Sequence, residues 1–282
     1  NSLKKEKKLN IKFSKQLPKN YKKYDFIFLQ SNFTKVKNFD KFKNDVKVVL
    51  VEPRLGHNNN LKLKFSLVIF NSIESQIFFS NKILFSKNII YPTFPEYEIK
   101  SKKKFKNDGK VVITYHGNKV HLENSKEQII STLNNISSVF KNKKINVFLI
   151  YNIKNLGFSK NINSKNNITI KHVQYSSSNI VKILSNTDIG LVPQTLKRKG
   201  FFQVLSKKKN NYDLIFKETT NLGRHLVFGQ FKIPVITEPT PSVIKFFDDE
   251  SMEYIVHDEN SWFKVLKKLI IDCELRSSLG IK

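Results

Sequence analysis

The stretch NYDLIFKETTNLGRHLVFGQFKIPVITEPTPS, which runs from residue 211 to residue 242, decides how this sequence folds. Within it, Leu222, Leu226 and Gly229 recur at helical spacing, and the apolar run 233–236 follows after a short turn. The stretch therefore predicts a loop, a helix and a buried strand in that order. This is the repeating unit of an α/β protein with a parallel sheet.

The start of this helix has the features of an anion-binding site. Thr219, Thr220 and Asn221 precede the helix, and either Thr220 or Asn221 can cap it. The N–H groups of the first turn have no partner within the helix, and together with the positive end of the helix dipole they favour a bound anion. Lys217 and Arg224 flank the same turn and can contact that anion. Most capped helices bind only water, so this prediction needs support from other stretches.

A second helix start follows directly after the strand. In the segment 239–242, Thr240 is expected to be the N-cap and Pro241 to occupy the first helical position. If both helices pack on one sheet, the two helix starts face the same cleft.

The composition is that of a large and basic globular protein. With 282 residues, 39% of them hydrophobic, the chain is long enough for about two domains with a core each. Lys and Arg number 50 against 23 Asp and Glu, and the resulting net charge of +27 favours anionic partners. Because the Lys residues are scattered and Lys, Asn, Ile and Phe are frequent throughout, we interpret most of this charge as a general compositional bias.

The sequence carries no sign of secretion or of membrane insertion. The single cysteine, Cys273, excludes an intramolecular disulfide and fits a reducing cytoplasm. No apolar run approaches the roughly 20 residues that a transmembrane helix needs, and no signal peptide is visible. We therefore expect a cytoplasmic protein, with peripheral contact to the inner face of an anionic membrane as a further possibility. The chain starts at Asn1 without Met, which predicts a trimmed piece of a longer protein.

Two αβ regions are separated by a polar, lysine-rich linker near residue 100. Residues 1–100 are predicted to form a partial Rossmann-like domain, and residues 101–282 a second Rossmann-like domain with a sharper alternation of strands and helices. The expected strands are 26–29, 46–51, 67–70, 89–90, 111–115, 145–151, 168–172, 189–193 and 235–236, and the expected helices include 72–80, 125–140, 178–186 and one final helix that starts at Asp258 or Ser261.

A glycine-containing turn after the strand 111–115 offers a second contact for an anion. Gly117 can let the backbone approach a phosphate, and Asn118 and Lys119 follow it with a polar and a charged side chain. His116 fits a donor to a diphosphate or a general base, and equally a histidine that only stabilises the turn. Because there is no GxGxxG or Walker motif, a structural turn is the preferred interpretation of this segment taken alone.

Two carboxylates lie near the predicted anion site. Glu218 or Glu238 could accept hydrogen bonds from sugar or ribose hydroxyls, and exposed loop carboxylates are an equal alternative. The six His show no metal-ligand spacing, and no GxSxG motif or catalytic triad is recognisable. The sequence therefore predicts no metal site and identifies no catalytic residue.

Four motifs, taken in their order, resemble the C-terminal half of GT-B glycosyltransferases, near the large family of group 1 glycosyl transferases. They are VVITYHG, NIVKILSNTDIGLVP, KETTNLGRHLVFGQFKIPVI and YIVHDENSWFKVLKKLIIDCELRSSLG, and the resemblance covers about 170 of the 282 residues. The earlier segments YDFIFLQS, LVIFNSIES and NIIYPTFP are compatible with the later part of the family's acceptor domain.

The resemblance implies a GT-B architecture and an activity. Residues 1–100 would be part of the acceptor-side domain, and residues 101–282 the nucleotide-sugar-binding domain. The implied reaction is metal-independent hexosyl transfer from a nucleotide sugar, without a further cofactor, to a glycan, lipid-linked or cell-surface acceptor. A role in cell-envelope polysaccharide biosynthesis would follow.

The resemblance also implies which residues meet the donor. Lys217, Arg224 and the helix start 219–221 would neutralise the leaving diphosphate, where negative charge develops. Gly117, Asn118 and Lys119 would approach the same phosphates from the other side.

The sequence departs from the family's pattern at several places. The family often has two Glu with seven residues between them around this helix, whereas Thr219 and Val227 occupy those positions. Lys217, Asn221 and Arg224 instead match a Lys-x-x-x-Asn-x-x-Arg pattern of other subgroups, which leaves the donor sugar open. The first βα units of an acceptor domain and a terminal crossing helix are missing, so we expect a chain truncated at both ends.

Two alternatives stay open at this point. One is a nucleotide-sugar 2-epimerase, which shares the architecture. The other is a basic, non-catalytic α/β module that binds polyanions. Specific nucleic-acid binding is not expected, because the basic runs are not interleaved with aromatic residues.

Overall fold

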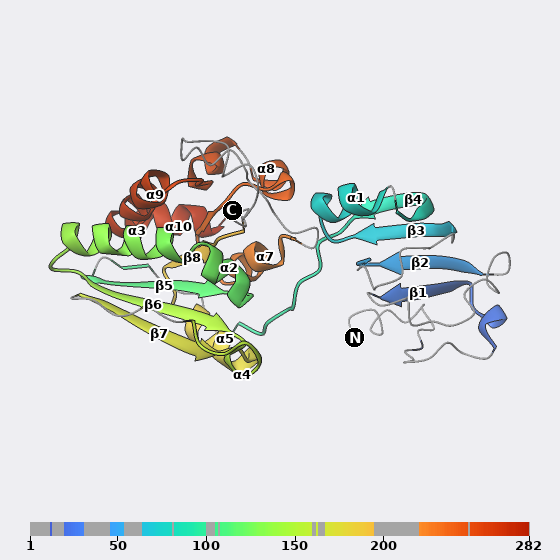
Figure 1. The fold of residues 1–282 in the computed structure, drawn as a ribbon, viewed down its shortest axis with the longest axis horizontal. Helices are drawn as coiled ribbons and strands as arrows, with labels where there is room; N and C mark the ends of the chain where they lie inside the picture. Colours follow the sequence, from blue (N-terminus) through green and yellow to red (C-terminus); the bar gives the residue numbers. More distant parts are fainter. Residues whose placement is uncertain are drawn as a thin grey trace, which may run out of the picture. The chain divides into compact units, whose positions relative to one another are not determined.

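The described residues of the computed structural model form two compact units (Figure 1). One unit lies within Asn1–Asn71 and Ser75–Tyr91, and the other within Ser72–Glu74 and Pro92–Lys282. The sequence-based boundary between residues 100 and 101 stays a prediction of the domain limits. The structure describes residues 12, 20–30, 46–53, 64–80, 82–99, 105–106, 108–159, 162, 167–194, 220–247 and 249–281.

The first unit contains a four-stranded parallel sheet, one α-helix and a short 3-10 helix among its described residues. Its strands pair in the order β1 (Phe26–Gln30), β2 (Lys47–Val51), β3 (Lys64–Phe70) and β4 (Leu84–Ile90), and its helices are η2 (Tyr21–Lys23) and α1 (Ile73–Ser80). Leu50, Phe65 and Val68 are fully buried, and Phe79 of α1 packs into the same core. The four strands and the helix predicted for this region are confirmed.

The second unit is built on a five-stranded parallel sheet in the order β7-β6-β5-β8-β9. The chain runs from β5 outward through β6 to β7, then returns to the other side of β5 and continues through β8 to β9. The direction of winding thus reverses between β5 and β8, and the carboxyl ends of strands at such a point are where open α/β sheets bind ligands. The strands are β5 (Lys110–His116), β6 (Lys144–Tyr151), β7 (Ile168–Gln174), β8 (Ile189–Val192) and β9 (Val235–Thr237).

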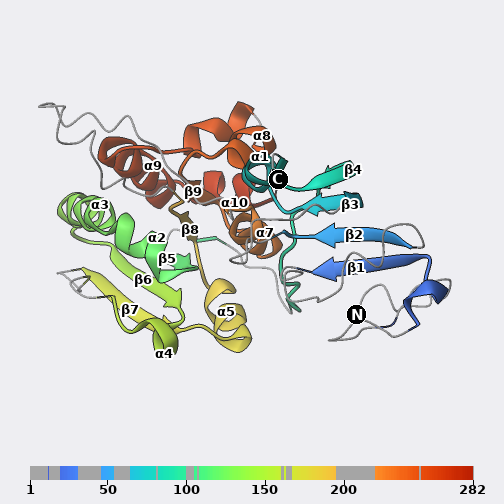
Figure 2. The same cartoon turned by 45° about the vertical axis from the view of Figure 1, so that its right-hand side comes forward.

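Helices cover both faces of this sheet because each presents an apolar stripe. On one face, α3 and α9 lie side by side in both views (Figure 1, Figure 2) and bury Leu133, Trp262 and Leu266 against the strands. On the other face, α5 and α7 bury Ile180 and Phe228. The helices of this unit are α2 (Lys119–Asn124), α3 (Lys126–Val139), α4 (Ile153–Leu156), α5 (Ser177–Leu184), α7 (Gly223–Gln230), α8 (Pro241–Phe246), η5 (Asp249–Tyr254), α9 (Glu259–Ile271) and α10 (Cys273–Ile281).

Two predicted helix starts are confirmed. Thr240 is the N-cap of α8 and accepts a hydrogen bond from the backbone N–H of Val243 at 3.3 Å, with Pro241 in the first helical position. Asp258 is the N-cap of α9, where it forms a capping box with Ser261. These caps depend on contacts within one helical turn, which is why the sequence alone predicts them.

The end of the chain differs from the single final helix that the sequence suggests. The structure has α9 and then a separate helix, α10, with Asp272 between them. The Asp272 carboxylate accepts a hydrogen bond from the backbone N–H of Leu275 at 2.8 Å. A short acceptor side chain of this kind ends one helix and starts the next, and the apolar residues on both sides of it concealed the break.

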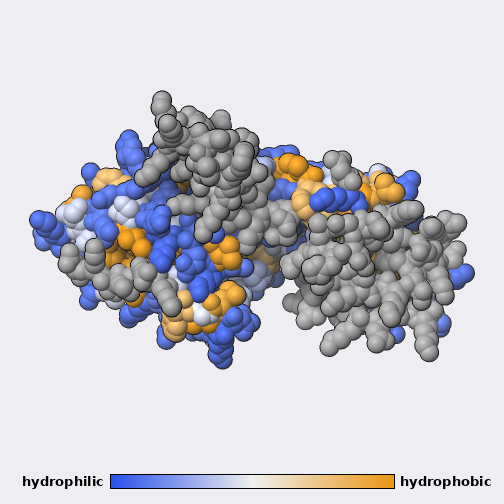
Figure 3. All heavy atoms as spheres, in the orientation of Figure 1, coloured by the Kyte–Doolittle hydropathy of each residue, from blue (hydrophilic) through white to orange (hydrophobic). Residues whose placement is uncertain are grey.

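The face of the second unit that is visible in Figure 3 carries many polar residues. Figure 3 shows hydrophilic residues in blue across much of the visible face of the second unit, with apolar residues in scattered groups. Within the ranges given above, no helix is long and apolar enough to cross a membrane.

Candidate functional site

The candidate site lies at the reversal point of the second sheet, where β5, β8 and β9 end. His116 and Gly117 follow β5, Pro193 and Gln194 follow β8, and Glu238 follows β9. Helix α7 starts beside these strand ends. Parallel strands direct all their carboxyl ends to one edge, so segments far apart in the sequence meet here.

Arg224 is the cation that the structure places at this edge. Its Nη1 donates a hydrogen bond to the carbonyl oxygen of Pro193 at 2.9 Å. Burial lowers the pKa of the guanidinium, while the nearby Tyr115 and Glu238 oppose that shift. An arginine stays charged in spite of such a shift, so the edge of the sheet holds a desolvated positive charge.

Gly117 packs directly against the Arg224 side chain. A Cβ atom at position 117 would lie 3.0 Å from Cδ of Arg224 and 3.1 Å from Oη of Tyr115, and the backbone at Gly117 has a φ of +149°. Both the close approach and the left-handed backbone require glycine. The structure therefore brings together two residues that the sequence predicted for one anion site, Gly117 and Arg224.

Two buried histidines flank Arg224. His225 Nε2 lies 2.8 Å from the hydroxyl oxygen of Thr237, and the His116 ring packs against Phe228 with centroids 4.7 Å apart. Burial, followed by the positive charge of Arg224, lowers the pKa of each histidine to about 3. Both imidazoles are therefore neutral near pH 7, and a pKa of about 3 does not suit His116 to act as a general base there.

Two buried side-chain oxygens at this edge, Gln194 Oε1 and Thr220 Oγ1, lack a protein partner. Buried side-chain polar atoms in folded proteins are nearly always hydrogen-bonded to protein or water, so these exceptions need an explanation. A ligand with hydroxyl groups would supply partners of the right kind. The His116 and His225 rings have backbone partners, at Arg224 and Leu222 respectively.

The start of α7 differs in detail from the expected cap. The helix begins at Gly223, its N-cap is Leu222, and no side chain makes a capping hydrogen bond. Asn221 Oδ1 instead accepts a hydrogen bond from the N–H of Gly223, the first residue of the helix, at 2.9 Å. Thr220 is buried. The predicted N-cap at Thr220 or Asn221 is therefore wrong, and Asn221 bonds one N–H group of the first turn from outside the N-cap position.

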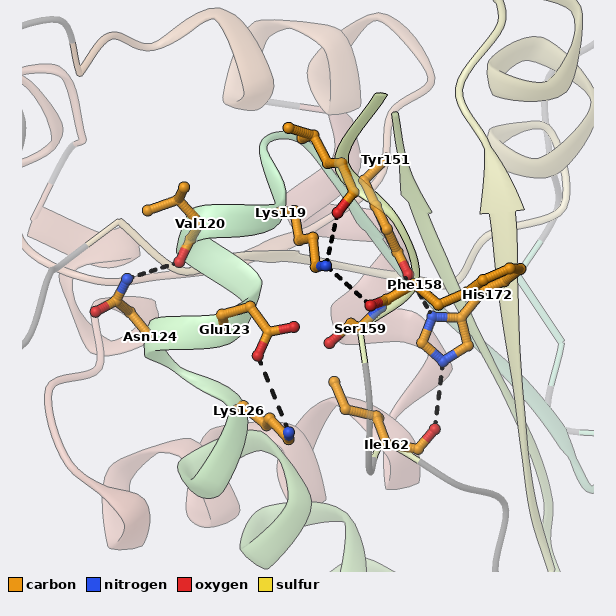
Figure 4. A network of polar contacts seen from close by, with 11 residues as sticks. Lys119, Val120, Glu123, Asn124, Lys126, Tyr151, Phe158, Ser159, Ile162 and His172 are labelled. Carbon is orange, nitrogen blue, oxygen red and sulfur yellow. Dashed lines mark hydrogen bonds and ion pairs between the residues drawn. The ribbon is translucent and has the colours of Figure 1, made fainter. Parts of the chain in front are cut away.

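Asn118 and Lys119 make local contacts in the structure, and Figure 4 shows those of Lys119. Asn118 caps α2 by accepting a hydrogen bond from the Val120 N–H at 2.9 Å. The Lys119 ammonium donates to the carbonyl oxygens of Leu156 and Phe158, both at 2.8 Å. Lys119 therefore ties the start of α2 to the end of α4, and its contact with a phosphate stays a prediction.

The remaining predicted residues have mixed outcomes. Lys217 and Thr219, together with Glu218, lie outside the described residues. Glu238 is 2% exposed, and its Oε2 accepts a hydrogen bond from the backbone N–H of Gln194 at 2.8 Å. That carboxylate joins the ends of β8 and β9, and its contact with sugar hydroxyls stays a prediction.

The sequence reasoning did not single out His225. Its signal is positional, because His225 lies one turn after Leu222 on the face of α7 that packs on the sheet. A polar residue at a core-facing position needs a buried partner, which here is Thr237.

Packing fixes the position of α7 relative to the strands. A Cβ at Gly190 of β8 would lie 2.9 Å from the ring of Phe228, so the glycine lets α7 rest directly on the strand. At the other end of α7, the Gln230 amide accepts from the Tyr97 N–H at 3.0 Å and donates to the Pro95 carbonyl at 2.9 Å. These contacts hold the helix start, and Arg224 with it, at the edge of the sheet.

The described residues contain no group of three or more His, Cys, Asp or Glu side chains that could hold a metal ion.

The arrangement is similar to that of solved glycosyltransferases. The TM-score is 0.52 against S. aureus TarM, at 11% identity over 84% of this chain and 46% of that chain. It is 0.50 against the pneumococcal O-GlcNAc transferase GtfA, at 11% identity over 91% of this chain and 52% of that chain. The TM-score is 0.51 against E. coli trehalose-6-phosphate synthase bound with UDP-2-fluoro glucose, at 11% identity over 90% of this chain and 67% of that chain. The fold is GT-B.

The GT-B likeness is one of fold, and it is partial in length. No protein-family model matches the sequence, and no curated protein is detectably similar to it in sequence. The chain spans about half the length of TarM and GtfA. The TarM and GtfA structures both contain UDP.

Proposed function

We propose that this GT-B chain carries the donor site of a glycosyltransferase that uses a nucleotide sugar. The observation that carries the proposal is the contact between Arg224 and Gly117 at the reversal point of the second sheet, beside the uncapped start of α7. The backbone of Gly117, the guanidinium of Arg224 and the N–H groups at the start of α7 are together suited to bind a diphosphate.

The reaction breaks the bond between the sugar and the diphosphate, and negative charge then develops on the leaving group. Arg224 and the N–H groups of the first turn of α7 stabilise that charge. They act strongly because they are fixed in place and withdrawn from bulk water. The neutral histidines add no second positive charge beside Arg224, and Glu238 is a carboxylate near its guanidinium. Lys217 adds a second cation in this proposal, on sequence grounds alone.

The acceptor and the setting belong to the same proposal. We infer a glycan or lipid-linked acceptor, transfer on the cytoplasmic side, and peripheral contact with an anionic membrane surface. The net charge of +27 supports the membrane contact, because each basic residue near an anionic surface contributes about 1 kcal/mol. The TarM and GtfA complexes with UDP make uridine diphosphate the first nucleotide to test.

A thermal-shift screen with UDP, GDP, ADP and CMP tests the donor site. A ligand that binds only the native state raises the melting temperature by mass action. We expect one nucleotide to do so, and we expect Arg224→Ala to abolish the shift while Lys267→Ala, an exposed change on α9, preserves it. A full shift in Arg224→Ala, or no shift with any nucleotide in the unaltered chain, would contradict the proposal.

A further inference from the structure

A polar pocket lies at the edge of the five-stranded sheet opposite the candidate donor site. It is formed where β6 and β7 begin, whereas the candidate donor site lies where the strands end. Since β6 has eight residues and strands rise about 3.3 Å per residue, the two places are roughly 23 Å apart along the sheet. The cavity measures about 280 Å³ and is lined by Lys141, Asn142, Lys143, Lys144, Asn167 and Thr169.

One wall of this pocket is fixed by a network of hydrogen bonds around Asn167. Its amide nitrogen donates to the carbonyl oxygens of Phe140 at 2.6 Å and Lys143 at 2.9 Å, and its amide oxygen accepts from the hydroxyl of Ser137 at 2.6 Å. The turn is also closed by the Lys143 N–H, which donates to the Phe140 carbonyl at 3.0 Å. The turn that carries the lysines is therefore held in place relative to β7.

Two lysines are paired across β5 and β6, and one of them, Lys144, lines the pocket. Lys110 of β5 and Lys144 of β6 are register partners on neighbouring parallel strands, so their side chains leave the same face of the sheet. Both are exposed, as is Lys141 in the adjacent turn. Among the described residues, no carboxylate forms an ion pair with any of these three lysines. Asp108 is the nearest acidic residue in sequence, and its carboxylate accepts from the Lys110 backbone N–H at 3.2 Å.

Directly opposed like charges destabilise a sheet, and a bound anion removes that repulsion. The pocket also supplies neutral donors, because Thr169 on β7 brings a hydroxyl group and Asn142 an amide. On the same face of β7, two residues after Thr169, Lys171 is a further exposed cation.

We propose that this pocket is a second anion site, which binds the phosphate groups of a small, multiply phosphorylated ligand. A concave site with side-chain donors on its wall fits a compact ligand that enters it, whereas a flat anionic membrane surface would touch only the rim. The site does not depend on the nucleotide site, because it uses other residues at the other edge of the sheet.

Calorimetric titration with inorganic pyrophosphate at low salt tests the site. The titrations use the Arg224→Ala chain, so that the candidate donor site does not contribute. We expect binding at one site, and a loss of about tenfold in affinity when Lys141→Gln and Lys144→Gln are added. Raising the salt concentration should weaken binding in the parent more than in this variant, because exposed charges are screened. Both lysines are exposed, so the substitutions leave the core intact.

A matched control removes two exposed lysines elsewhere. Lys264→Gln and Lys267→Gln on α9 change the net charge by the same amount and should leave pyrophosphate affinity within about twofold. The proposal is overturned if pyrophosphate does not bind, if the Lys141 and Lys144 substitutions have no effect, or if the α9 pair weakens binding equally.

Two further ligands distinguish the source of the phosphate. Long-chain polyphosphate should bind each chain no more than about tenfold more tightly than pyrophosphate, because the cavity holds only a compact group. Much tighter binding of polyphosphate would mean that the ligand of this site is a polymer and not a small molecule.

Vesicles containing phosphatidylglycerol should bind the Lys141 and Lys144 variant as they bind the parent. Loss of vesicle binding without loss of pyrophosphate binding would overturn the assignment in favour of a membrane.

Discussion

The two edges of one sheet hold positive charge in different ways. At the carboxyl edge, Arg224 is half-buried, bonded to the Pro193 carbonyl and packed against Gly117. At the amino edge, Lys110 and Lys144 stand exposed and opposed to each other. A half-buried, oriented cation is less affected by salt and more selective for the shape of a ligand than exposed lysines, which attract any anion and are screened. The edges should therefore respond differently to pH, packing changes and salt.

The largest expected effect is that of low pH on the unfolding free energy, and it comes from the two buried histidines at the carboxyl edge. In the unfolded chain, His116 and His225 gain protons as the pH falls below their ordinary pKa of 6.5, whereas in the folded chain they do so only near the lowered pKa of about 3. Between these values the unfolded chain binds more protons. The stability from the neutral histidines is fully present above pH 6.5 and falls towards pH 3, by up to about 1.4 kcal/mol per pH unit for each histidine.

Urea unfolding of His116→Phe across pH 4 to 7 measures this effect. We expect the slope of unfolding free energy against pH to decrease by up to about 1.4 kcal/mol per pH unit. This corresponds to one proton, because the variant has one buried imidazole fewer. His257→Phe replaces an exposed histidine and should keep the original slope. Equal slopes in all three proteins would contradict the neutral, buried state of His116.

The position of α7 can be disturbed at a single glycine. Gly190→Ala places a methyl group 2.9 Å from the Phe228 ring and should lower the unfolding free energy by about 1–3 kcal/mol. Gly229 lies in α7 itself, and a Cβ atom there would meet no atom within 4 Å. Gly229→Ala should therefore be neutral or stabilising by up to about 1 kcal/mol. Unfolding midpoints in urea compare them, and an equal effect of the two substitutions would mean that α7 does not rest on β8 as described.

Gly117→Ala tests the glycine beside Arg224. The new methyl group would lie 3.0 Å from Cδ of Arg224 and displace it, so affinity for the nucleotide found in the thermal-shift screen should fall about tenfold. Gly109→Ala also sits at a positive φ, of +77°, but meets nothing within 4 Å. It should lose about 1 kcal/mol of stability and keep its affinity. Unchanged binding in Gly117→Ala would remove Gly117 from the proposed site.

The last comparison concerns the far end of α7. Gln230→Ala removes hydrogen bonds to the Tyr97 N–H and the Pro95 carbonyl and should destabilise the chain by about 1–2 kcal/mol. Gln230→Glu keeps the acceptor and loses the donor, so about half of that loss is expected. If the melting temperatures of both variants match that of the unaltered chain, the amide does not hold residues 95–97 on the helix.

The sequence predicted those features that depend on neighbouring residues. Continuous apolar runs such as 145–151 predicted buried parallel strands, and Thr240 and Asp258 predicted helix starts, all of which the structure confirms. The resemblance to GT-B glycosyltransferases also predicted the fold correctly. The separate helix α10 was missed because Asp272 interrupts an apolar pattern that continues on both sides.

The sequence by itself thus determined the elements and their parallel pairing, because periodicity, capping and turn chemistry act within a few residues. The donor-site residues named from it stay predictions. Only the tertiary structure decided that the sheet reverses between β5 and β8, that Gly117 meets Arg224, and that His116 and His225 are neutral. It also decided that Lys110 faces Lys144. These facts follow from strand order and burial, which join segments that no local pattern connects.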